Sequence, residues 1–529
     1  MVTLGLDYVS PLPPVASGIA DYSIDLLPHL CELADVRVLA LAGQPVAEAV
    51  QARYHPEPAE TVGQTGRLPL YQMGNNPYHA EIWRLARERP GVLTLHDWLL
   101  HHLAGHLTLG RADFHAYRRQ LEVDHGWVGA ATALPRRFSL ESQASLFSLP
   151  VHRSLLLAQR GVLVHSRWAA ERVAEENPEV RVRAIPMGIP LPAAADPAAG
   201  LALRRRLSIP ESVPLLGSFG FQTPIKRTAA VVAALSDPRL AAAHLVVVGE
   251  ASPALDLAGE AARAGVAERV HVMGYVPWAD FEAAVSAVDV CLNLRYPTAG
   301  ETSASLLRVL AAGRPAIVSD YGQFRDLPEA VALRVPLGEG ESESLAAALA
   351  ELLESPERLA AMGRAARAHV RSEHDPAESA RQIVEACLEW RELSPPGPRP
   401  PRERPATSLV APGEVQAGLE VAGADRPWAE GERREVEILL TNAGQVTWLA
   451  AEKGPGGLAL EVVFSAGEGG PPRPWRGLPR DVPPGEQVGF RVPLRRPLGE
   501  AELRLRLWRL GPWTSQGGPE ALVEWRRAV

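Results

Sequence analysis

Through about residue 390, short apolar runs alternate with helix-like stretches, and this alternation restricts the fold more than any other feature of the chain. In the first half the strand-like runs cover 2–8, 36–41, 91–97, 160–166 and 182–188. The stretch after the first run, GIADYSIDLLPHL (18–30), repeats apolar residues at helical spacing. Alternation of strands and helices predicts a parallel sheet covered by helices.

A second series of strand-like runs begins near residue 213. Its members cover 213–220, 243–250, 270–275, 288–294 and 315–320, with stretches rich in Ala and Leu between them. Each series is about 180 residues long, too much for one sheet and suitable for one doubly wound domain. We therefore predict two α/β domains, residues 1–192 and 193–392, joined near the Pro- and Ala-rich segment 186–200.

The chain changes character after residue 393. Residues 393–405 read as a semi-rigid Pro-rich linker. In residues 406–529, runs such as 434–442, 488–494 and 502–510 alternate apolar and polar residues, which predicts a small antiparallel β-sandwich. Six of the twelve Trp lie in this part: Trp428, Trp448, Trp475, Trp508, Trp513 and Trp525. Exposed Trp would stack on sugar rings; the alternative is that most fill the sandwich core.

Charge and cysteine content exclude several classes. The net charge of −8 argues against a nucleic-acid-binding protein. The three Cys are widely spaced, so neither a disulfide framework nor a zinc motif is predicted. We expect a cytoplasmic chain, because neither a secretory signal nor a membrane-spanning run is visible. The basic cluster Arg204–Arg206 leaves peripheral membrane contact open, with a solvated face as the alternative.

Parallel sheets bind ligands beyond the carboxyl ends of their strands, so we followed each strand into its loop. The segment YPTAGETSASLLRVLAAG (296–313) passes Gly300 and Glu301 before a helix that Thr302 or Ser303 would cap. A helix N-terminus attracts phosphate, and a glycine lets the backbone approach it. The alternative is a capped surface helix.

A second loop carries an unusual cation. After the strand that ends at Gly220, Lys226 and Arg227 precede a helix that begins near Thr228. Only Lys226 and Lys453 are lysines among 54 basic residues, so a retained lysine indicates a need for a compact ammonium. Two cations beside a helix start would bind a diphosphate; the alternative is two solvated surface charges.

The first domain offers further candidate groups at strand ends. His96 and Asp97 end the third run, where they could orient a hydroxyl or handle a proton; the alternative is a capping pair. Gly18 opens the first helix. In GNNPYHAEI (74–82), the candidate polar groups are Asn75, Asn76 and His79, and an Asx turn capping a helix near Tyr78 is the preferred alternative.

Several motifs are absent from the sequence. No GxGxxG opens the first helix, and neither a P-loop nor a GxSxG elbow occurs. No DxD occurs, which would bridge a metal to a nucleotide diphosphate. We expect no cofactor and no metal.

Taken in order, seven segments resemble a family 4 glycosyltransferase with two facing Rossmann-like domains, the GT-B arrangement. The resemblance covers about residues 1–390 and rests on SPLPPVASGIADYS (10–23), LTLHD (93–97), RGVLVHS (160–166), IPMGIP (185–190), GSFGFQTPIKR (217–227), VHVMGYVPWADF (270–281) and GETSASLLRVLAAGRPAIVSD (300–320). The later segments TNAGQVTWL (441–449) and 478–494 resemble an immunoglobulin-like β-sandwich.

The resemblance implies transfer of a sugar from a nucleotide-sugar to a hydroxyl of a glycan, glycolipid or protein-glycan, with retention and without metal. It also implies roles for single residues. Gly18 and Gly220 would face the donor phosphates, Lys226 would neutralise the β-phosphate, and the backbone of Thr302 and Ser303 would hold the diphosphate. Glu301 would touch the donor sugar, Gly274, Tyr275 and Val276 would border the base, and His96 would face the acceptor or the reacting sugar.

Two departures from the family pattern concern the donor site. The family's second Glu, on the helix, is replaced by Arg308, and the Arg after the phosphate-loop Gly is replaced by Phe221. One hypothesis is that Arg227 or Arg308 supplies the missing phosphate contact. The departures keep two alternatives open: a catalytically degenerate binding or scaffold protein, and a nucleotide-sugar epimerase.

Overall fold

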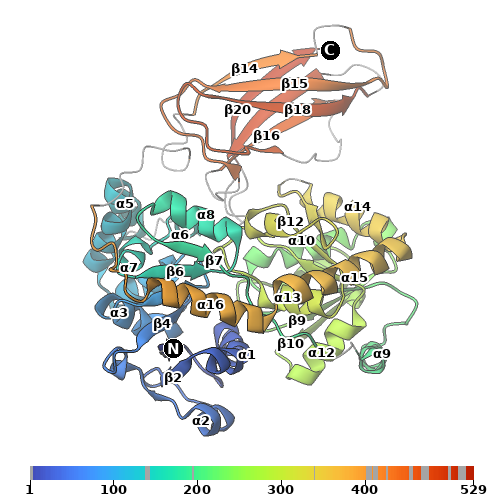
Figure 1. Ribbon diagram of the computed structural model, residues 1–529. Helices are drawn as coiled ribbons and strands as arrows, with labels where there is room; N and C mark the ends of the chain where they lie inside the picture. The colour runs from blue at the N-terminus through green and yellow to red at the C-terminus, as the bar shows by residue number, and fades with distance from the viewer. Residues whose placement is uncertain are drawn as a thin grey trace.

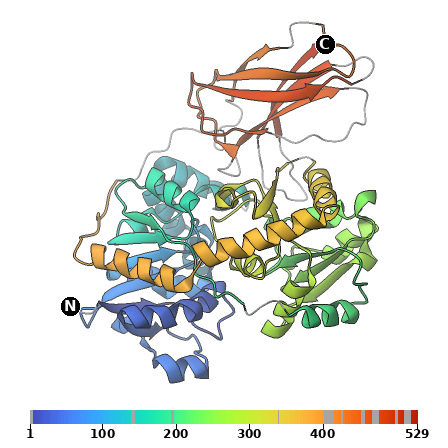
Figure 2. The same cartoon turned by 45° about the vertical axis from the view of Figure 1, so that its right-hand side comes forward.

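The computed structural model describes residues 4–137, 143–192, 196–338, 340–400, 408, 415–423, 427–451, 457–465, 476–497, 502–509 and 520–528. Two α/β domains lie side by side, and a β domain lies above both of them in the view of Figure 1 (Figures 1 and 2). The joint residues 193–195, linker residues 401–405, Trp475 and Trp513 lie outside the described residues.

The first domain is a parallel sheet in the order β3-β2-β1-β4-β5-β6-β7. Its strands are β1 (Gly5–Val9), β2 (Asp35–Ala40), β3 (Glu57–Pro58), β4 (Leu68–Met73), β5 (Val92–Leu95), β6 (Gly161–Val164) and β7 (Val182–Ala184). Its helices are α1 (Gly18–Leu33), α2 (Glu48–Tyr54), α3 (Ala80–Glu88), α4 (His101–Thr108), α5 (Phe114–Arg137), α6 (Gln143–Ser148), α7 (Arg153–Leu156) and α8 (Arg167–Glu176). The sequence analysis missed β4, which lies between β1 and β5 and is buried along its whole length.

The second domain is also a parallel sheet, in the order β10-β9-β8-β11-β12-β13. Its strands are β8 (Leu215–Phe219), β9 (His244–Val248), β10 (Val270–Gly274), β11 (Val290–Asn293), β12 (Ala316–Ser319) and β13 (Ala332–Val335). Its helices are α9 (Pro197–Arg206), α10 (Thr228–Ala234), α11 (Leu257–Arg263), α12 (Trp278–Ala287), α13 (Ala304–Ala311), α14 (Glu341–Leu353) and α15 (Pro356–Glu373). The two parallel sheets confirm the predicted pair of doubly wound domains.

The last helix of this unit, α16 (Pro376–Trp390), returns to the first domain and packs against α1 (Figure 1). A Cβ on Gly161 of β6 would lie 2.0 Å from the ring of Trp390, so only glycine admits this indole. Residues after α16 stay on the same domain, since Gly397 donates its N–H to Leu157 O. The chain therefore passes between the two domains more than once, and these crossings hold the domains together.

The C-terminal region contains two antiparallel sheets, in the orders β14-β15-β18 and β17-β16-β19-β20. Their strands are β14 (Ala417–Ala422), β15 (Arg433–Asn442), β16 (Leu458–Ser465), β17 (Arg476–Gly477), β18 (Gln487–Arg495), β19 (Glu502–Arg509) and β20 (Glu520–Ala528). Inward side chains of both sheets share one core, which confirms a small all-β sandwich. Trp428 and Trp448 are buried in this core, and Trp525 packs against it, as the alternative to sugar stacking predicts.

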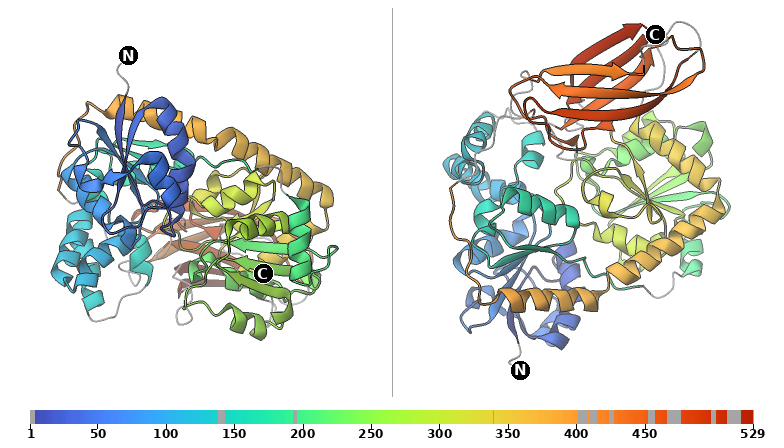
Figure 3. Two further views of the ribbon diagram at one scale, coloured as in Figure 1. Left: turned by 90° about the horizontal axis from the view of Figure 1, so that it is seen from below. Right: turned by 45° about the horizontal axis from the view of Figure 1, so that its top comes forward.

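The carboxyl ends of both parallel sheets meet where the domains face each other, as the view from below shows (Figure 3). Several direct contacts close this boundary. Leu99 N donates to Ala299 O at 3.0 Å, and Trp168 N donates to Asp326 Oδ2 at 3.2 Å. Loops predicted to carry chemistry in either domain therefore lie opposite one another.

Candidate functional site

The loop after β8 carries Lys226, whose ammonium lies close to the end of that strand. Lys226 ends the short 3-10 helix η4 (Pro224–Lys226), and its Nζ donates to Phe219 O. Gly220 has φ +86°, and a Cβ there would lie 2.9 Å from Lys226 Nζ. The left-handed backbone favours glycine at 220, and a side chain there would displace the ammonium of Lys226.

The environment of Lys226 weakens its hold on a proton. Burial and the nearby guanidinium of Arg295 together lower the pKa of Lys226 to about 7. Among the residues that the structure describes, no carboxylate forms an ion pair with this ammonium, so it is suited to an anionic ligand that would restore its charge.

Arg295 is the cation that the sequence analysis missed. It follows β11, one residue before the segment in which the loop was sought. It is buried, forms an ion pair with Glu301, and leaves its Nε without a partner. Burial lowers the pKa of Arg295 to about 10, whereas Asp97 of the first domain raises it. The sequence feature that could have identified Arg295 is a charged residue that follows an apolar strand-like run.

Asp97 faces Arg295 from the opposite domain. Its Oδ2 accepts the N–H of Asn75 at 2.7 Å. Burial raises the pKa of Asp97 to about 6, although the Asn75 hydrogen bond and Arg295 oppose the rise. A carboxylate with a pKa near neutrality can receive a proton. The predicted candidates Asp97, Glu301 and Lys226 are thus brought together around Arg295.

Helix α13 begins beside this group. Ser303 caps it, accepting Leu306 N at 3.3 Å, as predicted, and Asn293 donates to the same hydroxyl at 3.1 Å. Thr302 is half-buried just before the cap. Glu301 accepts a hydrogen bond from the Thr298 hydroxyl at 3.0 Å.

Gly300 lies against the first domain. A Cβ at Gly300 would lie 2.5 Å from Trp98 Cβ and 2.8 Å from Trp168 Cζ3, and its φ is +79°. The glycine admits two indoles of the first domain, so its backbone approaches a neighbouring domain there. Trp98 and Trp168 meet edge to face, with ring centroids 5.7 Å apart.

His96 is committed to the interior of the first domain. Its Nδ1 lies 3.2 Å from His165 Nε2, and its Nε2 lies 2.9 Å from Gln72 Oε1. His165 Nδ1 lies 3.0 Å from Ile185 O, which can only accept, so that nitrogen carries the proton. Burial lowers the pKa of His165 to about 4 and that of His96 well below its usual value, so both rings are neutral.

These constraints fix the tautomer of His96. Since His165 Nε2 has only a lone pair, His96 must donate from Nδ1, and its Nε2 must accept. The Gln72 carbonyl would then face a lone pair while the Gln72 NH2 group has no partner. Turning that amide over satisfies both groups. His96 then has no free ring nitrogen, and its contact with acceptor or sugar stays a prediction.

The segment 74–82 contains a cap, as the preferred alternative states. Asn76 Oδ1 accepts Tyr78 N at 3.0 Å and lies 3.0 Å from His79 Nδ1, at the start of η2 (Pro77–His79). His79 is fully buried, and burial lowers its pKa to about 4. Asn75 lies nearer the domain boundary. Its backbone N–H donates to Asp97, and its side-chain Nδ2 lies 3.1 Å from His102 Nδ1.

The remaining candidate glycines lie at the start of a helix and at the end of a strand. Gly18, after the N-cap Ser17, is exposed, and a Cβ there would meet no atom within 4 Å. Gly274 has φ +69°, and its carbonyl accepts Gly249 N at 2.8 Å. Tyr275 is 79% exposed, and Val276 is half-buried. A flat ring could stack on Tyr275.

Arg227 is less available than predicted. It has φ +56°, and its guanidinium pairs with Glu341, which is buried at the start of α14. Because this carboxylate neutralises it, we expect Arg227 to contribute less to an anion site than Lys226 or Arg295.

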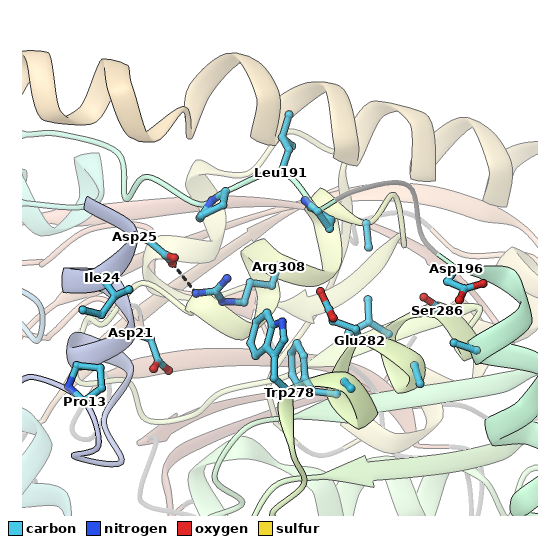
Figure 4. Close-up of a pocket in the computed structure, with 18 residues that line it drawn as sticks. Pro13, Asp21, Ile24, Asp25, Leu191, Asp196, Trp278, Glu282, Ser286 and Arg308 are labelled. Atoms are coloured by element: carbon cyan, nitrogen blue, oxygen red, sulfur yellow. Dashed lines mark hydrogen bonds and ion pairs between the residues drawn. The ribbon is translucent and has the colours of Figure 1, made fainter. Parts of the chain in front are cut away.

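Arg308 lies in a pocket of about 710 Å³ between α1, α12 and α13 (Figure 4). It donates to Asp25 Oδ2 at 2.6 Å, and its guanidinium lies 4.8 Å from the centre of the Trp278 ring. Burial raises the pKa of Asp25, whereas Arg308 opposes this rise. The other acidic side chains in the lining are Asp21, Asp196 and Glu282. This pocket carries more negative than positive charge, so it suits an uncharged group better than a diphosphate.

The basic cluster on α9 is paired rather than free. Arg204 is buried and binds Asp289 at 2.8 Å, while Arg205 pairs with Glu211 and Arg206 with Asp280. Within the described ranges, no helix has the length and apolarity needed to cross a membrane. In the same ranges no three His, Cys, Asp or Glu side chains gather as a metal site.

Comparison with known proteins bears on this geometry. The family described as Glycosyl transferases group 1 matches residues 214–355, which hold Lys226, Arg295 and Glu301. The matched residues lie within the second domain of this chain. No curated protein matches the chain.

Two solved structures show the wider fold. The Anabaena protein HepE in complex with UDP and glucose has a TM-score of 0.52 and 16% identity, covering 73% of this chain and all of its own. Sucrose-phosphate synthase from Thermosynechococcus elongatus has a TM-score of 0.52 and 18% identity, covering 73% of this chain and 98% of its own. At such identities the likeness shows the GT-B fold.

Proposed function

We propose that this protein is a glycosyltransferase that moves a sugar from a nucleotide-sugar to a hydroxyl of a glycan, glycolipid or protein-glycan. One observation carries the proposal: in the region that the glycosyltransferase group 1 model matches, Lys226 and Arg295 lie in the loops after β8 and β11, and Arg295 faces Asp97 across the domain boundary. The solved structure of HepE, which shares this fold, holds UDP and glucose.

The charges suit the donor half of the reaction. Breaking a glycosidic bond to a diphosphate builds negative charge on the leaving group, which preorganised cations stabilise. We infer that Lys226 and Arg295 bind that diphosphate, beside the N-terminus of α13. Glu301, paired with Arg295, is placed to orient both the guanidinium and a sugar hydroxyl.

The acceptor half falls to the first domain. Asp97, with its pKa near 6, can orient the attacking hydroxyl or receive its proton. Indoles of Trp98 and Trp168 close the boundary against Gly300 and exclude water, which would otherwise hydrolyse the donor. We propose a retaining, metal-independent reaction, because the cations of the chain supply the charge that a metal would bring.

The first experiment is thermal-shift screening with UDP, GDP, ADP and their sugars. A ligand well above its dissociation constant should raise the melting temperature by several degrees. Lys226→Met should abolish the shift, while Arg205→Met, which removes an exposed paired cation, should keep it. Absence of a shift with every nucleotide would contradict the proposal and favour a protein that has lost donor binding.

Turnover separates the remaining alternatives. With the stabilising nucleotide-sugar, a transferase releases nucleoside diphosphate only when an acceptor is present, whereas an epimerase converts the sugar without one. Binding without either reaction would favour a scaffold protein.

A further inference from the structure

The C-terminal sandwich packs directly against the loop that carries Arg295. Tyr296 and Tyr321 of the second domain form one buried cluster with Ala459 and Trp508 of the sandwich. The two tyrosine rings meet edge to face, with centroids 5.2 Å apart. Trp508 is 9% exposed. In Figure 3 the sandwich lies behind the boundary between the two α/β domains.

On the sandwich side, hydrogen bonding fixes the indole of Trp508. Its Nε1 donates to Glu461 Oε2 at 3.0 Å, and Glu461 is itself buried. Arg506 lies 3.4 Å from the same carboxylate. An indole held at both its ring and its N–H presents a rigid surface to Tyr296 and Tyr321.

On the other side, Tyr296 joins the two cation-bearing loops. It follows Arg295 directly, and its N–H donates to Ile225 O at 2.8 Å. Ile225 immediately precedes Lys226. The position of one aromatic ring therefore affects the backbone of both cations.

These cations need external support. Arg295 is buried and Lys226 is half-buried, and the two cations repel each other although Glu301 pairs with Arg295, which disfavours their charged forms. The chain between β11 and α13 has no regular hydrogen-bonded structure of its own. A loop that holds two like charges together needs packing from outside it.

We propose that the C-terminal sandwich is a structural part of the candidate site, with Trp508 as a positioning residue that keeps Arg295 and Lys226 in place to bind a diphosphate. As a part of donor binding this inference rests on the proposed function. Its effect on the loop can be measured without any ligand.

The test compares the full-length protein with Trp508→Ala by hydrogen–deuterium exchange. The amides of 294–303 and 223–228 should exchange roughly tenfold faster in the variant, while those of 74–80 should not change. Trp508→Phe, which keeps an aromatic ring, should restore most of the protection. Trp525→Ala is the matched control, because Trp525 packs against the sandwich core and not in the Tyr296 cluster.

A second measurement reports on Lys226 itself. Its amine-labelling midpoint should move upward in Trp508→Ala, because water would reach the ammonium, and should stay in place in Trp525→Ala. If UDP binds the wild type, its dissociation constant should rise roughly tenfold in Trp508→Ala, as for other small displacements of binding groups.

Unchanged exchange at 294–303 in Trp508→Ala would overturn the inference, whatever the ligand results. Faster exchange of the loop in a protein that binds no nucleotide would support the contact with the sandwich and overturn its role in donor binding. That second outcome would also count against the proposed function, so the two failures are distinguishable.

Discussion

At the scale of single residues, Lys226 is the side chain whose chemistry the fold alters most clearly. The chain has replaced lysine by arginine almost everywhere, yet it keeps a lysine at the end of η4. The compact ammonium of Lys226 lies close to Gly220, where a Cβ built on the glycine would be 2.9 Å from Nζ.

We predict that Lys226 titrates near neutrality in the absence of ligand. Amine labelling followed by mass spectrometry can resolve it, because Lys453 is the other lysine and serves as the internal reference. The labelling midpoint of Lys226 should lie near pH 7, the pKa that burial and Arg295 impose. A bound nucleoside diphosphate should raise the midpoint, since nearby negative charge favours the ammonium.

Gly220→Ala gives the matched perturbation, because its Cβ would press on Nζ and strain the backbone. We expect its labelling midpoint to differ from that of the wild type. A wild-type midpoint near pH 10, like that of an exposed lysine, would contradict the geometry described for this loop.

At the scale of secondary-structure elements, Arg308 connects α13 of the second domain to α1 of the first. Arg308 reaches Asp25 of α1 across the boundary, with 17% and 19% of the two side chains exposed. The pair is thus partly shielded from solvent, and it lies over Trp278 at the opening of the 710 Å³ pocket. Arg308 therefore belongs both to the contact between the two domains and to the wall of the pocket.

We predict that Arg308→Ala and Asp25→Ala each weaken donor binding by about 3- to 10-fold, and that the double variant is little worse than either single one. Contacting residues show coupling energies of roughly 0.5–3 kcal/mol, which double-mutant cycles measure. Calorimetric titration of the stabilising nucleotide with the four proteins checks this. Asp196→Ala is the control, since Asp196 lines the same pocket without an ion pair to Arg308.

Additive losses in that cycle would mean that Arg308 acts on the donor directly, as the hypothesis of a replaced phosphate contact holds. An unchanged dissociation constant in Arg308→Ala would exclude both explanations.

At the scale of the whole molecule, buried imidazoles make the fold sensitive to acid. Burial lowers the pKa values of His79, His165 and His374 to about 4, and that of His96 well below its usual value. In the unfolded chain these groups titrate near pH 6.5. A depressed folded pKa contributes stability above pH 6.5 that is lost as pH falls toward 4.

Carboxyl groups withdrawn from water oppose this effect. Burial raises the pKa values of Asp97 and Asp124 to about 6, and it also raises those of Asp25 and Glu341, so their contribution favours the fold as pH falls. We expect the four imidazoles to outweigh these carboxyl groups and to leave a net loss of stability between pH 6.5 and 4.

We predict that the melting temperature at pH 5 is several degrees below that at pH 7.5, because each buried imidazole loses on the order of 1–2 kcal/mol there. Differential scanning fluorimetry in buffers of equal ionic strength measures it. His165→Gln, whose amide can still donate to Ile185 O, should reduce the drop. A melting temperature that does not change between these pH values would contradict the buried, neutral state of the rings.

Much of the architecture could be predicted because its signals are local. Apolar runs and helical spacing located most strands of both parallel sheets, and the caps at Ser303 and Asn76 followed from short polar side chains. β4 was missed because LPLYQM carries a proline and a glutamine inside a buried strand. Lys226, Glu301 and Asp97 were chosen as candidates because each lies in the segment that follows a strand, where the topology of a parallel sheet gathers ligand contacts.

The tertiary structure alone decided which of these groups have partners. Arg308 and Asp25 are 283 residues apart, and Trp508 meets Tyr296 from a separate domain. It also pairs Arg227 with Glu341 and His96 with His165. It places Arg295 near Lys226. The sequence by itself determined the elements and the loops between them, because helix spacing, strand alternation and capping act over a few residues. Charge pairing and burial depend on which surfaces pack together, and only the folded chain sets that.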